Sequence, residues 1–166
     1  MLIRPEKPSD IADIFAVTQA AFANHPFSQQ TEGFIVNALR AAEALTISLV
    51  AEVDNKLVGH IAFSPLTISD GTAHWYGLGP LAVLPAYQRQ GIGKALMQQG
   101  LADLKANAAQ GCALVGDPHY YPQFGFKNST HLSYTCIPPD YFFILPFTAT
   151  VPQGIVTFHA GFGATH

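Results

Sequence analysis

Apolar residues recur at helical spacing in three segments of the chain. Residues 9–23 place their apolar side chains largely on one helical face, and residues 31–44 show the same spacing after an Asn-His-Pro break. The third segment, residues 91–108, carries its apolar residues along one stripe and ends before Gly111. The pattern therefore predicts a helical pair near the N-terminus and another helix in the middle of the chain.

Between these helices the pattern changes to alternating and β-branched residues. Residues 47–53 and 57–68 predict two strands joined by a hairpin loop at 54–56, and a turn at Asp70-Gly71 leads into a third strand over 74–83. These strands predict a three-stranded antiparallel meander. A short apolar run at 112–115 follows the central helix and predicts a buried strand beside the third one.

The last part of the chain is unusually apolar. Residues 128–166 contain a single charged side chain, Asp140, among many aromatic and β-branched residues. We therefore expect this segment to be buried in strands or in an interface. Its aromatic group is most simply core or a subunit contact, which predicts a possible homodimer; the residues are Tyr141, Phe142, Phe143 and Phe147.

The composition is typical of one folded domain. Of the 166 residues 49% are hydrophobic and 11% charged, which excludes disorder for most of the chain. A net charge of −3 provides no basic surface, so we expect neither nucleic acid nor a membrane as partner. The longest strongly apolar stretch, 141–147, is far below the roughly 18 residues of a membrane span, and the N-terminus lacks a signal-peptide pattern. These features predict a cytoplasmic protein.

The seven histidines and two cysteines suggest neither a metal site nor a disulfide framework. They show no zinc-ligand spacing, so no metal is expected. Secreted disulfide frameworks usually contain more cysteines in shorter chains, which favours a reducing compartment. We expect Cys112 and Cys136 to be small core residues.

The strongest chemical signal is the loop between the third strand and the central helix. Residues 88–94 read Gln-Arg-Gln-Gly-Ile-Gly-Lys. The two glycines leave the main chain bare, and the first-turn N–H groups of a helix have no internal partner. With the helix dipole and the charges of Arg89 and Lys94, these donors suit a diphosphate. On spacing alone, a tight turn without a ligand explains the glycines equally well.

Two other phosphate-binding motifs do not match. A Walker-type loop ending at Gly93-Lys94 requires glycine in place of Gln88 and Ser or Thr in place of Ala95. Residues 77–82 match the dinucleotide pattern in letters but continue into an apolar strand instead of opening a helix. We interpret that match as chance.

Two motifs resemble the GNAT superfamily of N-acetyltransferases. Residues 88–93 match its Gln/Arg-x-x-Gly-x-Gly/Ala signature, and residues 121–126, Tyr-Pro-Gln-Phe-Gly-Phe, resemble its second motif, Tyr-x-x-x-Gly-Phe, in order and spacing. Residues 116–121 and 156–159 resemble the YhbS-like bacterial branch of this superfamily. The resemblance runs over nearly the whole chain, with its specific part in 81–126.

The resemblance implies a fold and a set of site residues. The fold is α/β (α+β): a single N-acetyltransferase domain over 1–166, with a mixed, mostly antiparallel sheet splayed into a V, flanking helices, core motifs in 81–126 and an apolar strand region in 138–166. Acetyl-CoA lies in the V, and Tyr121 protonates the departing thiolate. Main-chain groups hold the pantetheine arm at Leu81, Ala82 and Val83, and the pyrophosphate at Arg89, Gln90, Gly91, Ile92, Gly93 and Lys94.

The implied reaction is acetyl transfer from acetyl-CoA to a primary amine of a small molecule or peptide. The amine attacks the thioester directly, without a covalent intermediate, and a base or water chain must first remove its proton. Many relatives carry a glutamate near the strand before the phosphate loop, yet residues 75–87 contain no acidic residue. A non-catalytic acyl-CoA-binding regulatory module is therefore the alternative.

Four side chains are candidates for the base, and each has a structural alternative. His60 lies within a predicted strand, where a packed or hydrogen-bonded histidine is the simpler interpretation. His74 follows a turn and can simply be exposed. Asp117 lies before Pro118 and can cap a turn; His119, the fourth candidate, lies next to that proline. Tyr121 also has an alternative, because without the family motif its aromatic neighbours favour a place in the core.

Overall fold

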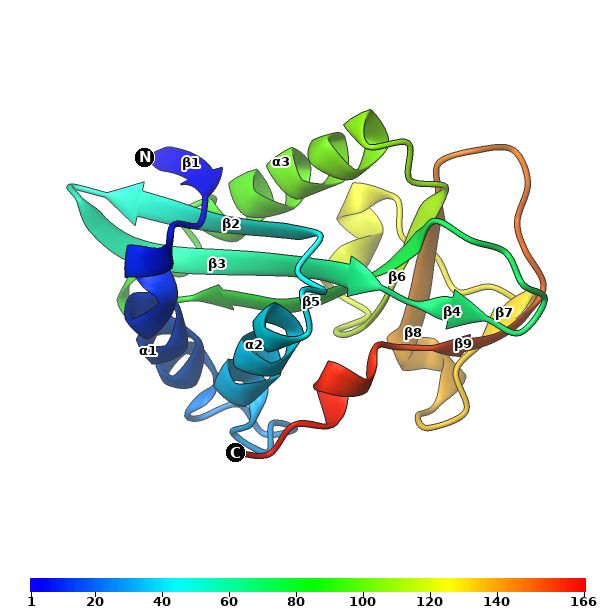
Figure 1. Cartoon of the computed structure of the whole chain (residues 1–166), viewed down its shortest axis with the longest axis horizontal. Coiled ribbons are helices and arrows are strands. Elements are labelled where there is room, and N and C mark those ends of the chain that lie inside the picture. The colour runs from blue at the N-terminus through cyan, green and yellow to red at the C-terminus, as the bar shows by residue number, and fades with distance from the viewer.

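A six-stranded sheet forms the centre of the computed structural model, which describes residues 1–166 (Figure 1). The order is β1-β2-β3-β5-β6-β8, and only the β5–β6 pair is parallel. The sheet is thus mixed and mostly antiparallel, as predicted. Its strands are β1 (Leu2–Pro5), β2 (Ile47–Val53), β3 (Lys56–Pro65), β5 (Trp75–Val83), β6 (Gly111–Val115) and β8 (Phe142–Pro146).

The predicted meander is formed by β2, β3 and β5. Asp54 and Asn55, both at positive φ, make the turn between β2 and β3. Such left-handed conformations match the twist of a two-residue hairpin, and Asp and Asn tolerate them better than most residues. The strand predicted over 112–115 is β6, and it lies beside β5.

Helices cover both faces of the sheet. Figure 1 shows α1 (Ile11–Phe22) and α2 (Glu32–Ala41) on one face and α3 (Ile92–Ala106) on the other. All three predicted helices are present, with slightly shorter bounds. The largest hydrophobic cluster lies between α3 and the sheet and includes Phe63 and Leu96, both fully buried. None of the helices combines the length and hydropathy that a membrane span requires.

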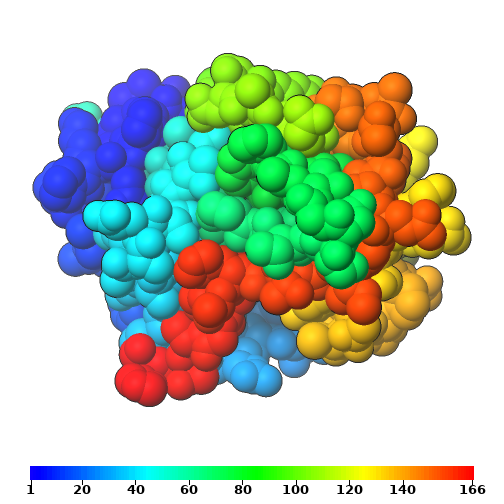
Figure 2. Space-filling view, turned by 45° about the vertical axis from the view of Figure 1, so that its right-hand side comes forward, coloured from blue at the N-terminus to red at the C-terminus, as the bar shows by residue number.

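The apolar C-terminal region forms strands, as its composition predicted: β8 joins the central sheet, and two more strands belong to a second, three-stranded sheet. The second sheet has the order β4-β9-β7, from β4 (Thr67–Ile68), β9 (Gly154–Thr157) and β7 (Leu132–Ser133). A short 3-10 helix, η5 (Ala160–Gly163), then reaches α2, where Gly161 lies against Leu39. Figure 2 shows these last residues in red against the middle of the chain.

The expectation that both cysteines are core residues is confirmed for one of them and wrong for the other. Cys112 is fully buried in β6, but the prediction that Cys136 is a core residue was wrong: it is exposed in the turn after β7. Turn backbone lies at the surface, because its polar groups need solvent, and Cys136 lies there with it. Phe142 and Phe143 are buried within the chain, whereas Tyr141 is 41% exposed.

Candidate functional site

The sheet opens along the edge of β5 that faces β6. These two strands pair only between residues 75–77 and 111–113. Beyond Gly77, β5 continues to Val83 while pairing only with β3. Three steps on β5, from Leu78 to Leu81, match two steps on β3, so β5 has a bulge at Gly79-Pro80, where the peptide bond is cis. The result is the splayed sheet predicted from the sequence.

Main-chain groups on this open edge alternate in direction. Leu84 N–H donates to Val58 O at 2.8 Å, so the register places Ala82 in the same orientation, facing its partner His60 on β3. Leu81 and Val83 therefore direct their main-chain groups toward the opening. Of the three residues predicted to hold a pantetheine arm, these two have groups available to a ligand that pairs like a strand.

The loop before α3 presents an uninterrupted series of free donors. None of the main-chain N–H groups in residues 89–94 donates to a protein acceptor, and the first helical bond in this region is from Ala95 N to Gly91 O. Gly91 caps α3 with φ +86°, and a Cβ built on it would meet nothing within 4 Å. Arg89 and Lys94 are exposed beside these amides. Free N–H groups, a helix N-terminus and two cations together suit a polyanion.

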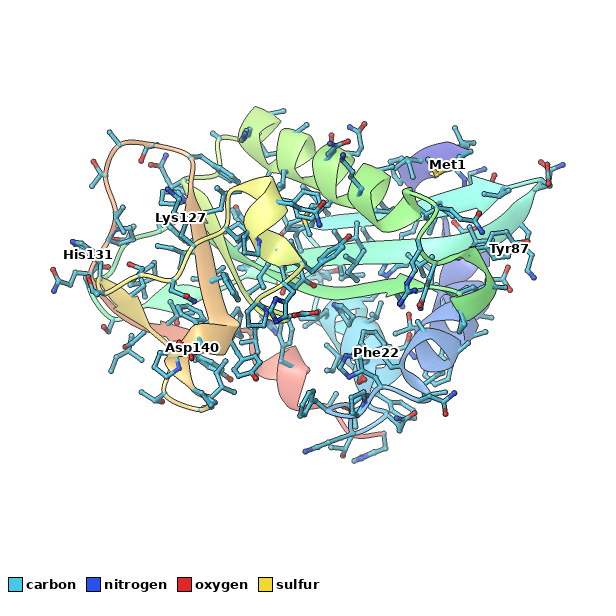
Figure 3. The ribbon with its side chains drawn as sticks, turned by 180° about the vertical axis from the view of Figure 1, so that it is seen from behind. Met1, Phe22, Tyr87, Lys127, His131 and Asp140 are labelled. Carbon is cyan, nitrogen blue, oxygen red and sulfur yellow. The ribbon has the colours of Figure 1, made fainter.

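Gln88 holds this loop against β5. Its Nε2 donates to Val83 O at 3.0 Å, and Gln90 Nε2 donates to Ala86 O at 3.4 Å. Gln88 is the first residue of the sequence motif, and the motif alone predicted no role for its side chain. The contact explains why a side-chain amide is useful there: it connects the loop to the end of the strand. Figure 3 shows Tyr87, the residue before it, beside the start of α3.

Two adjacent tyrosines stand on the β6 side of the opening. The ring of Tyr121 packs so closely on Gly116 that a Cβ there would overlap it, and it meets Phe126 edge to face at 6.1 Å between ring centroids. Burial raises the pKa of Tyr121, so its hydroxyl stays protonated and can act only as a neutral donor or acceptor at physiological pH. The ring of Tyr121 therefore lies in the aromatic core, as its structural alternative predicted.

His60 is a fully buried part of a polar network under α1 and α2. Its Nε2 lies 2.7 Å from Ser48 Oγ and 3.9 Å from Glu6 Oε1, and Nδ1 has no partner. Burial lowers the pKa of His60 to about 4. The prediction that it is packed and hydrogen-bonded is confirmed.

The other candidate bases are separated along the opening. His74 is exposed where β5 begins, at the closed end of the V. Asp117 Oδ1 accepts a hydrogen bond from His119 N at 2.8 Å, so the carboxylate caps the turn after β6, as its structural alternative predicted. The side chains of Asp117 and His119 are exposed on the same side of the opening as Tyr121. No group of three or more His, Cys, Asp or Glu side chains could hold a metal ion.

Known proteins share this sequence and fold. Residues 12–126 match the sequence profile described as the acetyltransferase (GNAT) family. The uncharacterised N-acetyltransferase YhbS of Escherichia coli K12 is 34% identical over 137 residues, covering 82% of this chain and 79% of YhbS.

Two crystal structures are similar over nearly the full length. A GNAT family acetyltransferase from Brucella melitensis in complex with acetyl-CoA has a TM-score of 0.87 and 51% identity, with 97% of each chain covered. Escherichia coli YhbS in complex with CoA has a TM-score of 0.90 and 29% identity, covering 99% of this chain and 93% of that one. Because the family profile spans more than half of the sequence and the relatives agree with it in sequence and fold, the chain belongs to the acetyltransferase (GNAT) family.

Proposed function

We propose that this protein transfers the acetyl group of acetyl-CoA to a primary amine. The observation that carries the proposal is the run of free main-chain N–H groups in residues 89–94, placed beside the unpaired edge of β5. A pyrophosphate fits the first feature and a pantetheine arm the second. Similar proteins have been crystallised with acetyl-CoA or CoA. A cytoplasmic location and a homodimer stay predictions.

The coenzyme would bind along the V from the α3 loop toward the bulge. Its pyrophosphate would accept hydrogen bonds from the amides of the α3 loop, near the cations Arg89 and Lys94. Its pantetheine arm would pair with Leu81 and Val83, with Ala82 between them holding the strand to β3. The thioester would then lie between the bulge of β5 and the 3-10 helix η3 (Tyr121–Phe124), near Tyr121.

In this reaction a neutral amine attacks the thioester carbonyl. A C–N bond forms, the C–S bond breaks, and the Tyr121 hydroxyl donates its proton to the departing thiolate. Burial raises the pKa of Tyr121, so the hydroxyl is protonated at physiological pH and can donate a hydrogen bond to the sulfur as negative charge develops there. The proton that the amine nitrogen loses as the amide forms leaves through water or through Asp117 or His119, the candidate bases exposed on this side of the opening, and water returns a proton to Tyr121.

A coenzyme-release assay separates this proposal from the binding-module alternative. Thiol release from acetyl-CoA is followed over a panel of small amines, aminoglycosides and peptides with free N-termini. Both functions predict CoA binding, and at about 100 times its Kd the ligand should stabilise the fold by about 2.7 kcal/mol. Amine-dependent thiol release supports the enzyme. Binding with no release across the panel supports the regulatory module, and absence of binding contradicts both.

Substitution of Tyr121 by phenylalanine tests the assigned proton donor. The ring packing against Gly116 and Phe126 is retained, so Tyr121→Phe should lower kcat by about 100-fold while changing the Kd of CoA little. Tyr134→Phe is the control, because that hydroxyl lies in a different aromatic cluster with Phe142 and Phe158. An unchanged kcat in Tyr121→Phe would mean that Tyr121 has only a packing role.

A further inference from the structure

The hydroxyl of Tyr120 reaches across the opening of the V. Tyr120 follows β6, but its Oη lies 3.0 Å from the position that a Cβ on Gly93 would occupy. The same position is 3.8 Å from Val83 Cγ2. Tyr120 therefore brings a polar group to the point where the first turn of α3 and the end of β5 meet.

Aromatic packing holds the Tyr120 ring in this place. It meets Tyr121 edge to face at 5.0 Å with an interplanar angle of 88°, and Phe124 at 5.4 Å. Its main chain is also fixed, since Tyr120 N donates to Asp117 O and Gln123 Nε2 donates to Tyr120 O. The side-chain hydroxyl itself makes no hydrogen bond within the chain. The ring thus fixes the position of the hydroxyl, and the O–H group is free to donate a hydrogen bond to a ligand.

The neighbours of this hydroxyl indicate which kind of ligand it suits. Gly93, beside which this hydroxyl lies, belongs to the run of free N–H groups at the start of α3, and Tyr120 adds an O–H donor to that run. A group that satisfies several donors at once needs several acceptor oxygens, which a phosphate has. Burial raises the pKa of Tyr120, so the hydroxyl faces an anion as a neutral donor and does not repel it.

We propose that Tyr120 is a coenzyme-binding residue whose hydroxyl donates a hydrogen bond to the pyrophosphate of acetyl-CoA. The inference rests on the proposed function. It gives Tyr120 and Tyr121 different roles in that function. Tyr120, turned toward α3, contributes to affinity for the coenzyme. Tyr121, whose ring packs against Gly116, contributes to turnover.

The test removes the hydroxyl and truncates the ligand. Tyr120→Phe keeps the ring contacts with Tyr121 and Phe124, and its Kd for CoA should rise about tenfold by calorimetry, the loss of one hydrogen bond to a charged group. Pantetheine lacks the pyrophosphate, so its Kd, measured by displacement, should not change. Tyr134→Phe should bind both ligands as the unmodified protein does.

The ratio of the two dissociation constants decides the outcome. Both titrations sample the same folded fraction, so a loss of stability in Tyr120→Phe cannot change this ratio. Equal weakening for CoA and pantetheine, or no weakening for either, overturns the role of Tyr120 at the pyrophosphate. If the unmodified protein fails to bind CoA, the proposed function fails instead, and the two results are distinguishable.

Discussion

The conformation of Gly91 is the residue-level feature on which the proposed coenzyme site depends. At φ +86° it lets the chain turn sharply from the loop into α3, and nothing lies within 4 Å of the position that its Cβ would occupy. An L-residue adopts this conformation only with strain, and any side chain there would project into the space beside the donors.

Gly91→Glu is expected to abolish CoA binding. The new carboxylate would fill the open space beside the amides and repel the pyrophosphate. Calorimetric titration with CoA measures the loss, which should exceed 100-fold in Kd. Retained affinity would contradict the assignment of this loop to the coenzyme.

Gly71 provides a matched control for this substitution. It lies at φ +85° in the turn before β5, and a Cβ on it would also meet nothing within 4 Å. Gly71→Glu thus carries the same backbone strain, of about 1 kcal/mol, and the same charge change away from α3. Its CoA affinity should stay unchanged, so that any difference between the two variants reflects the position.

Single residues were predictable where local chemistry decides their environment. The free amides at 89–94 follow from the helix start, and the turn-capping role of Asp117 follows from its position before a proline. Tyr120 was not singled out, because its approach to Gly93 depends on how the chain after β6 folds back across the opening. No local sequence pattern predicts the distance between the Tyr120 side chain and Gly93.

Elements were predictable in proportion to the length of their periodic pattern. The three long helices and the meander have enough residues for a repeat of 3.6 or 2 to appear. β1 has four residues, of which Arg4 and Pro5 conceal the pattern, and it is held by the bonds of Arg4 to Glu52 and Asp10. The two-residue strands β4 and β7 have no period at all, so the second sheet was not predicted.

The distance of α3 from the sheet is set by a glycine. A Cβ on Gly100 would overlap the ring of Phe63, which is fully buried in β3. Gly100→Ala should therefore lower the free energy of unfolding by about 1–3 kcal/mol, although alanine is the better helix former by about 1 kcal/mol. Urea unfolding measures the change.

Gln98→Ala is the control on the same helix, because Gln98 is exposed and is not one of the buried residues of α3. Its free energy of unfolding should change by less than about 0.5 kcal/mol. If Gly100→Ala were as stable as Gln98→Ala, close packing of Gly100 on Phe63 would not be what sets the distance of α3 from the sheet.

At the scale of the whole molecule, a partly buried polar network connects four segments. Glu6 follows β1, Arg40 lies in α2, Ser48 in β2 and His60 in β3. Arg40 pairs with Glu6 at 2.8 Å, and Ser48 donates to the same carboxylate. The hydrogen bonds of Arg40 and Ser48 hold the pKa of Glu6 below its usual value, against the opposing effect of burial. The network stabilises the sheet face under α1 and α2.

This network makes stability depend on pH through His60. The unfolded chain binds a proton at His60 below about pH 6.5, whereas burial lowers the folded pKa to about 4. Acid therefore favours the unfolded chain between these values, and the free energy of unfolding should fall by about 2 kcal/mol from pH 7 to pH 5. Glu6 and Asp10, whose pKa values are lowered, lose their contributions only at lower pH. Urea titrations at several pH values should show this slope in the unmodified protein and lose it in His60→Gln; the same slope in both would mean that His60 is not its source.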